Sequence, residues 1–112
     1  MSEIRNNKRF DLEDRTLHFA RDVRVFVRGL KPETASFEDG KQVVRSSGSV
    51  GANYLEANEA ISKKDFLLRL RIAKKEARET IYWLTLLEAP ERLVNEAREI
   101  MHILGAILEK SK

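Results

Sequence analysis

The residues that could bind a metal or transfer a proton are few in this chain of 112 residues. The sequence has two histidines, His18 and His102, and no cysteine. Glu99 and His102 have the E-x-x-H spacing of di-iron sites in helical bundles. Such a site needs a second pair of this kind, but Arg15 stands three residues before His18. We therefore predict no metal site and no cofactor, and we expect His102 to lie at the surface or its boundary.

Catalysis by a nucleophile is equally poorly supported. Without cysteine, the chain can form neither a thiolate nucleophile nor a disulfide. Two histidines leave no Ser-His-Asp arrangement that the spacing favours. Glu56 and Glu59 are spaced to share one side of a helix, but it is the polar side, where carboxylates are usually solvated or ion-paired. We predict that the protein is not an enzyme.

Gly48 and Gly51 could belong to a phosphate-binding loop or to a helix. Their G-x-x-G spacing matches a KH-type backbone clamp. A phosphate loop needs G-x-x-x-x-G-K-[ST] after a strand, and no strand pattern precedes these glycines. Small and apolar residues around them instead recur at the spacing of a helix stripe: Val43, Ser47, Val50, Tyr54, Ala57 and Ile61. Because glycine costs a helix about 1 kcal/mol relative to alanine, we predict that another helix packs closely at both positions.

Basic residues gather in one part of the chain, although the net charge is only +3. Residues 63–78 contain seven basic and two acidic residues, whereas residues 30–61 contain three basic and five acidic ones. Four cations share a narrow arc of a predicted helix and could follow a nucleic-acid backbone: Lys64, Arg71, Lys75 and Arg78. An earlier helix carries a second file, Arg21, Arg24 and Arg28. The alternative is a solvated face on which Glu76 and Glu79 partly neutralise the cations.

Four amphipathic segments must position these residues. After a polar lead-in at residues 1–10, which we expect to be mobile, the patterns predict helices over about 11–28, 38–61, 63–88 and 90–110. Gly29 and Pro32 mark the first connection. The S-x-x-D pair of Ser62 and Asp65 predicts a capped start for the third helix. Pro90 fits the first turn of the fourth.

Four helices with short connections pack most simply as an antiparallel up-down bundle. We therefore predict an all-α, single-domain four-helix bundle over residues 1–112, with Phe37 tucked under one end. No apolar run approaches the roughly 18 residues that span a bilayer, and the N-terminus has charges where a signal peptide needs apolar residues. We expect a cytoplasmic protein without a membrane partner.

The third predicted helix has two apolar sides. One side supplies a core stripe of Phe66, Leu70, Ala73, Ala77, Ile81 and Leu84. The nearly opposite side carries Leu68, Ile72, Tyr82, Trp83 and Leu86. A surface helix needs one apolar stripe, so a second one indicates burial against another subunit. We predict a homo-oligomer whose interface is anchored by Tyr82 and Trp83.

Several runs of residues resemble a known family. They are V-G-A-N-Y-L-E-A at 50–57, S-K-K-D-F at 62–66, R-I-A-K-K-E-A at 71–77 and Y-W-L at 82–84. With them, the chain after residue 10 resembles the bacterial four-helix bundle proteins encoded by intervening sequences of 23S ribosomal RNA genes. Many members of that family have proline at the position of Gly51, so the chain resembles a variant branch.

The resemblance implies a left-handed up-down bundle assembled as a ring, commonly a pentamer. A related branch comprises the accessory proteins of diversity-generating retroelements, which are basic rings that work with a reverse transcriptase and RNA. The family has no established catalytic residues, so the resemblance implies none in this chain.

These observations leave three functions to compare. The first is a non-enzymatic, homo-oligomeric scaffold, pentameric by resemblance, that binds RNA or DNA through its basic surface. The second is an adaptor that recruits a partner protein, such as a reverse transcriptase, without contacting nucleic acid. The third, a hydrolase, is poorly supported by the polar residues. Salt separates the first two, because phosphate contacts weaken steeply with added salt and apolar protein contacts do not.

Overall fold

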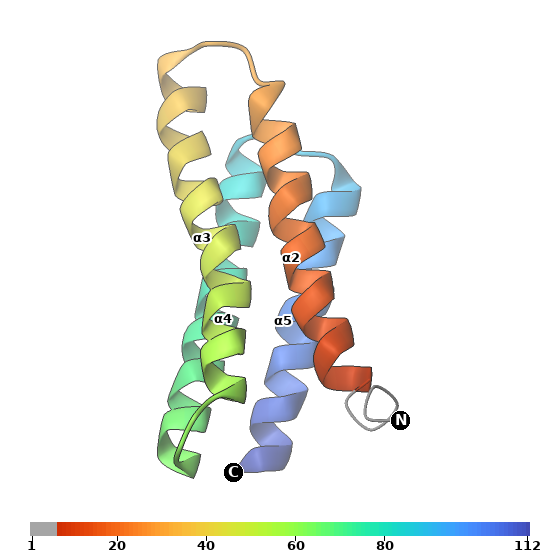
Figure 1. The fold of residues 1–112 in the computed structure, drawn as a ribbon. Helices are drawn as coiled ribbons and strands as arrows, with labels where there is room; N and C mark the ends of the chain where they lie inside the picture. Colours follow the sequence, from red (N-terminus) through yellow and green to blue (C-terminus); the bar gives the residue numbers. More distant parts are fainter. Residues whose placement is uncertain (1–6) are drawn as a thin grey trace.

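The computed structural model describes residues 7–112 of the chain. They form four helices and no strand: α2 (Asn7–Arg28), α3 (Thr34–Asn58), α4 (Lys63–Leu86) and α5 (Glu91–Ser111). Consecutive helices run in opposite directions and are joined at alternate ends of the molecule (Figure 1). The predicted all-α, up-down arrangement of four helices is confirmed.

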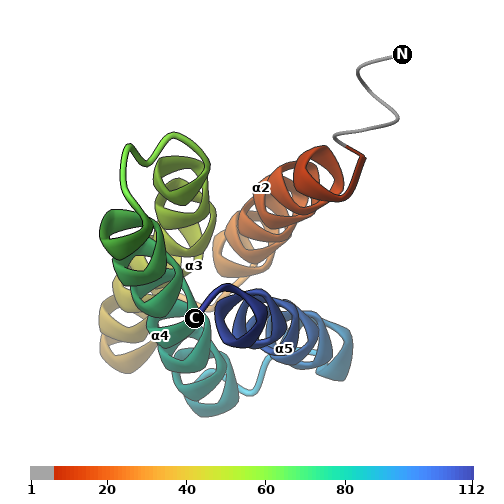
Figure 2. The same cartoon turned by 90° about the horizontal axis from the view of Figure 1, so that it is seen from below.

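The four helices are not equally embedded. The most extensive packing is between α3 and α4 and between α4 and α5, whereas α2 rests mainly on α3 and touches α5 less. Seen end-on, the start of α2 lies outside the group formed by the other three helices (Figure 2). The position of α2 therefore depends on a small number of specific contacts.

One stripe of each helix builds the core. Its buried apolar residues are Leu12, Phe19 and Val23 of α2, Val43, Val50, Tyr54 and Ala57 of α3, Leu70, Ala73, Ala77 and Leu84 of α4, and Leu93, Ala97, Ile100, Leu104 and Leu108 of α5. The stripes predicted for the second and third helices contain all the buried apolar residues of α3 and α4.

Two apolar residues near helix ends do not lie where the pattern placed them. Ile61 was expected on the buried stripe but is 98% exposed, because α3 ends at Asn58 and Ile61 belongs to the following connection. Phe37 was expected under the bundle end but is 64% exposed. Its ring instead lies 4.7 Å from the ammonium nitrogen of Lys41, one turn later in the same helix.

The predicted starts of two helices are too late. Helix α2 begins at Asn7, so residues 7–10 belong to its first turns, while residues 1–6 of the expected mobile lead-in lie outside the described residues. Helix α3 begins at Thr34, because no proline or glycine interrupts residues 34–37 and the Phe37 N–H donates to the Glu33 carbonyl at 2.9 Å. Pro32 stands outside the helix and does not oppose it.

The junctions around α4 follow known capping chemistry. The Ser62 hydroxyl accepts the Asp65 N–H at 3.1 Å, which confirms the predicted cap. At the other end, Glu88 has a left-handed backbone (φ 54°). The Ala89 N–H donates to the Leu84 carbonyl and the Glu88 N–H to the Thr85 carbonyl. These bonds form a Schellman ending. Glutamate occupies the position that usually holds glycine, so the residue types did not predict this ending.

Arg15 ties α2 to α5. Its guanidinium donates two hydrogen bonds of 2.7 Å to the Glu96 carboxylate and one of 2.8 Å to Glu99. These bonds from Arg15 hold the pKa of the Glu96 carboxyl below its usual value, against the opposing effect of partial burial. Since α2 touches α5 in few other places, this ion pair is a main part of their contact.

Acid is expected to weaken this contact. Because the pKa of Glu96 is lower in the folded than in the unfolded chain, its stabilising effect is fully present above the unfolded pKa and is lost as the pH falls through the folded pKa. Glu96→Gln should lower the free energy of unfolding by about 1 kcal/mol near neutral pH and by less near pH 3. Urea denaturation at both pH values measures this. Glu56→Gln, on an exposed face, is the control; an equal loss for Glu96→Gln at both pH values would contradict the argument.

Candidate nucleic-acid interface

The cations of α4 form a file on its outer side. Lys64, Arg71, Lys75 and Arg78 are all exposed. Their spacing of seven, four and three residues keeps them on one side of the helix. The file runs along one helix that is held on its other side by α3 and α5, so its geometry is fixed by the packed core.

Two acids of α4 close to this file bond to α3. Arg45 of α3 donates to the Glu76 carboxylate at 3.2 Å and to the Glu79 carboxylate at 3.1 Å. Across residues 7–112, none of the four cations of the file has an ion-pair partner within 4.0 Å. Glu76 and Glu79 therefore form no ion pair with the file, because both carboxylates bond to Arg45 between α3 and α4.

Lys74 extends the basic surface toward α5 and was not assigned to the site from sequence. Its side chain crosses Gly105, where the Cε atom lies 3.5 Å from the position that a Cβ would take. The pKa of the neighbouring Glu109 carboxyl is lowered mainly by its hydrogen bond from Lys112 and to a smaller degree by Lys74. Gly105, a glycine in the middle of a predicted helix, is the sequence feature that could have indicated a close neighbour at this point.

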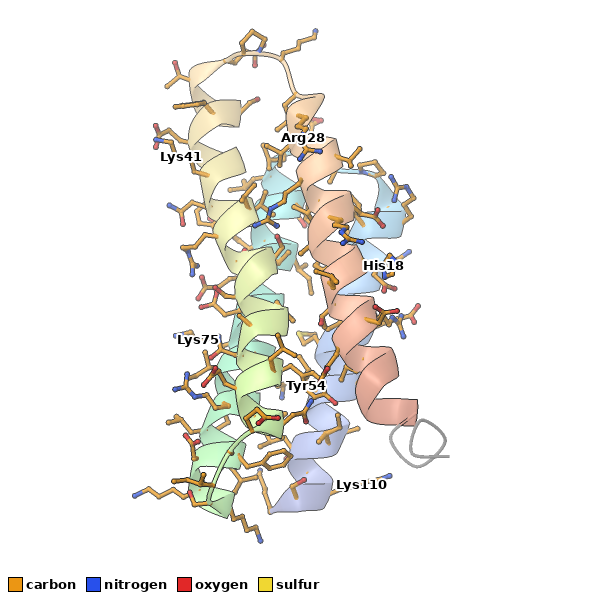
Figure 3. All side chains as sticks on the ribbon, viewed as in Figure 1. His18, Arg28, Lys41, Tyr54, Lys75 and Lys110 are labelled. Atoms are coloured by element: carbon orange, nitrogen blue, oxygen red, sulfur yellow. The ribbon has the colours of Figure 1, made fainter. Side chains whose placement is uncertain are left out.

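The second predicted set, on α2, does not stay together. Arg21 and Arg28 are exposed, but Arg24 is half-buried. Its guanidinium donates to the Ala20 carbonyl at 3.1 Å and to the Val44 carbonyl of α3 at 3.5 Å. Arg24 therefore serves the contact between α2 and α3. Figure 3 shows Arg28 near the end of α2, well away from Lys75 on α4, so the two sets are separate surfaces.

The two predicted packing glycines differ in what they face. A Cβ on Gly51 would lie 2.9 Å from the Thr16 hydroxyl and 3.1 Å from the Thr16 Cβ, so α2 crosses close to this point. Thr16 is buried, and its hydroxyl donates to the Glu13 carbonyl at 2.9 Å. A Cβ on Gly48 would meet only the guanidinium of Arg24, at 3.3 Å. The close helix contact is therefore at Gly51.

Two groups of exposed apolar side chains could take part in a contact between subunits. On α4, Leu68 is 49%, Tyr82 60% and Leu86 51% exposed, while Ile72 and Trp83 are half-buried. The second group borders a groove of about 310 Å³ between α2 and α3. Its sides include the exposed residues Leu17 and Leu55, and its lining includes Gly48 and Gly51.

The histidines do not form a metal site with their neighbours. Within residues 7–112, no group of three or more histidine, aspartate or glutamate side chains is placed to hold a metal ion. His102 is exposed, and His18 lies at the surface with its Nδ1 atom 3.0 Å from the Asp14 carbonyl (Figure 3). The described helices also include none that is long and apolar enough to cross a bilayer.

Comparison with known proteins places this fold in a family. The family model for 23S rRNA-intervening sequence proteins matches residues 8–109. The chain belongs to this family. A crystal structure from Bacteroides thetaiotaomicron, described as a protein of unknown function from the S23 ribosomal protein family, superposes with a TM-score of 0.83. The two sequences are 37% identical, and the match covers 91% of this chain and 98% of that one.

Membership of the 23S rRNA-intervening sequence family confirms the resemblance inferred from the sequence. No curated protein matches the chain. The family and its solved member establish the fold, and the relative is itself described as having no known function.

Proposed function

We propose that this protein is a non-enzymatic, homo-oligomeric scaffold of the cytoplasm that binds RNA or DNA through phosphate contacts. One observation carries the proposal. Arg45 bonds to Glu76 and Glu79, while Arg71, Lys75 and Arg78 of the α4 file are exposed to solvent. Cations left without protein partners can replace the counterions of a phosphate backbone. Lys64 and Lys74 extend the same surface.

The apolar faces support an oligomer. Leu68 and Leu86 project from the exposed side of α4, whereas Leu17 and Leu55 border a groove between α2 and α3 that contains glycine. Two dissimilar faces on one chain favour a head-to-tail contact, which closes into a ring when the rotation permits. We take the pentamer implied by the family resemblance as the proposed size. The α4 file lies on the same side of the helix as Leu68 and Leu86, so the cations would border this contact. A ring would repeat them around its axis, so that weak contacts act together.

Binding without strong sequence preference is expected from the residue types. The candidate residues are arginines and lysines on a single exposed helix side, which suit phosphate oxygens. Reading base edges requires side chains placed in a groove of the nucleic acid.

The adaptor function is a second candidate, and a specific observation favours it. Tyr82, Leu68 and Leu86 are about half exposed on α4 and could receive a partner protein such as a reverse transcriptase. In that case, the same face would recruit a protein and the cations would only keep the surface solvated.

Binding of labelled RNA and DNA at increasing salt tests the proposal. Light scattering first establishes the size of the particle in solution. If three cations per subunit each neutralise a phosphate, the slope of log K against log salt should be about −2 or steeper. No binding at low salt by a confirmed oligomer would remove the scaffold function and favour the adaptor. A clean monomer at micromolar concentration would remove the ring.

A further inference from the structure

We infer that Tyr82 is a base-stacking platform at the end of the α4 cation file and that the ligand is a single-stranded nucleic acid. The inference rests on the proposed function and names the class of nucleic acid. It also moves Tyr82 from the subunit interface, where the sequence pattern placed it, to the nucleic-acid surface.

The position of Tyr82 along α4 is the first reason. Tyr82 follows Arg71, Lys75 and Arg78 by eleven, seven and four residues, spacings that place all four side chains on one side of the helix. At 1.5 Å per residue, the distance from Arg71 to Tyr82 is about 16 Å along the helix axis. A backbone that follows the cations therefore arrives at the tyrosine ring.

The exposure and support of the ring are the second reason. Tyr82 is 60% exposed. Its ring packs edge-to-face with that of Trp83, with centroids 5.1 Å apart and planes at 80°. Trp83 is half-buried against the core, so it holds the neighbouring ring in place. A ring that is fixed by one aromatic neighbour and otherwise open to solvent is suited to receive a base at low entropic cost.

The other exposed aromatic residue of the described chain lacks these features. Phe37 is 64% exposed, but it lies on α3, and the Lys41 ammonium already occupies a position 4.7 Å from its ring centroid. Tyr54 is buried. Among the aromatic side chains described, only Tyr82 combines exposure with a place in the α4 cation file.

Stacking on an exposed ring selects single strands. In a duplex, both faces of each internal base are covered by its neighbours, whereas a single strand can place an unstacked base on an aromatic side chain. The arginines and lysines then contact the phosphates that lead to that base. RNA and DNA share this chemistry, so both are candidates.

Substitution of Tyr82 tests the inference. Tyr82→Ala should lower the affinity for single-stranded RNA, single-stranded DNA or both by about 5- to 150-fold, the range measured for losing one aromatic stack. Affinity for a duplex of equal length should change little, and Tyr82→Phe should retain single-strand binding. Phe37→Ala is the matched control, because it removes an exposed ring away from the file. Trp83 is the single tryptophan of the chain, so its emission should change when a single strand binds.

The outcomes separate the inference from the proposed function. If wild-type protein binds single strands and Tyr82→Ala leaves that affinity unchanged, the inference is wrong and the scaffold function stands. Equal losses for single strands and duplexes also overturn it. If Tyr82→Ala changes the oligomer size measured by light scattering, Tyr82 belongs to the subunit interface instead. If wild-type protein binds neither form, both proposals fail.

Discussion

Replacement of Arg71 and Arg78 by glutamate is expected to lower the affinity for RNA or DNA on the order of a hundredfold at low salt. Each substitution changes the local charge by two units. A unit charge pair at 4 Å is worth about 1 kcal/mol in water, and screening by salt reduces this value. The slope of log K against log salt should become shallower by about 2, since two phosphate contacts are lost. Fluorescence anisotropy with labelled oligonucleotides measures both quantities.

The chain offers a closely matched control for this pair. Arg21 and Arg28 are also exposed arginines seven residues apart on one helix, so Arg21→Glu with Arg28→Glu makes the same change of net charge on α2. We expect a clearly smaller loss of affinity for the α2 pair, and an unchanged oligomer size for both. Equal losses would mean that net charge, and not the α4 file, governs binding. Adding Lys75→Glu should deepen the effect of the α4 pair only.

Gly51→Leu is expected to destabilise the protein by about 1 to 3 kcal/mol or more, because it inserts a side chain where α2 already touches α3. Even a Cβ atom at Gly51 would lie 2.9 Å from the Thr16 hydroxyl. Thr16 is buried, and a β-branched side chain has little freedom to move aside. Relief therefore requires a shift of α2, the least embedded helix.

Gly48→Ala is the matched comparison in the same helix. The new Cβ would meet only the Arg24 guanidinium, the far end of a flexible side chain. Alanine also gains about 1 kcal/mol of helix propensity over glycine, so Gly48→Ala should be neutral or stabilising, whereas Gly51→Ala should be destabilising despite the same gain.

Thermal unfolding followed by circular dichroism, at one protomer concentration, measures all three variants. Combining Gly51→Ala with Thr16→Ala should recover part of the loss; equal stability of Gly48→Ala and Gly51→Ala would show that no close contact exists.

The local features of this protein could be predicted from its sequence. The three- and four-residue spacing of Val43, Ser47, Val50 and Tyr54 indicated a helix in a segment rich in glycine and serine, and the cap at Ser62 was correctly placed. Such signals work because backbone geometry fixes which side chains share a helix side, and because a cap involves residues only three positions apart. The runs that resemble the 23S rRNA-intervening sequence family were also sufficient to predict the family.

The tertiary structure alone decided which side chains face each other across helices. Arg24 was assigned to a surface file with Arg21 and Arg28, but its guanidinium bonds to Val44 of α3. Glu76 and Glu79 are close in sequence to Arg71 and Arg78, yet both pair with Arg45, more than thirty positions earlier in the sequence. The physical reason is that spacing along one helix does not fix the rotation and register of two helices against each other, which depend on how all the side chains between them pack.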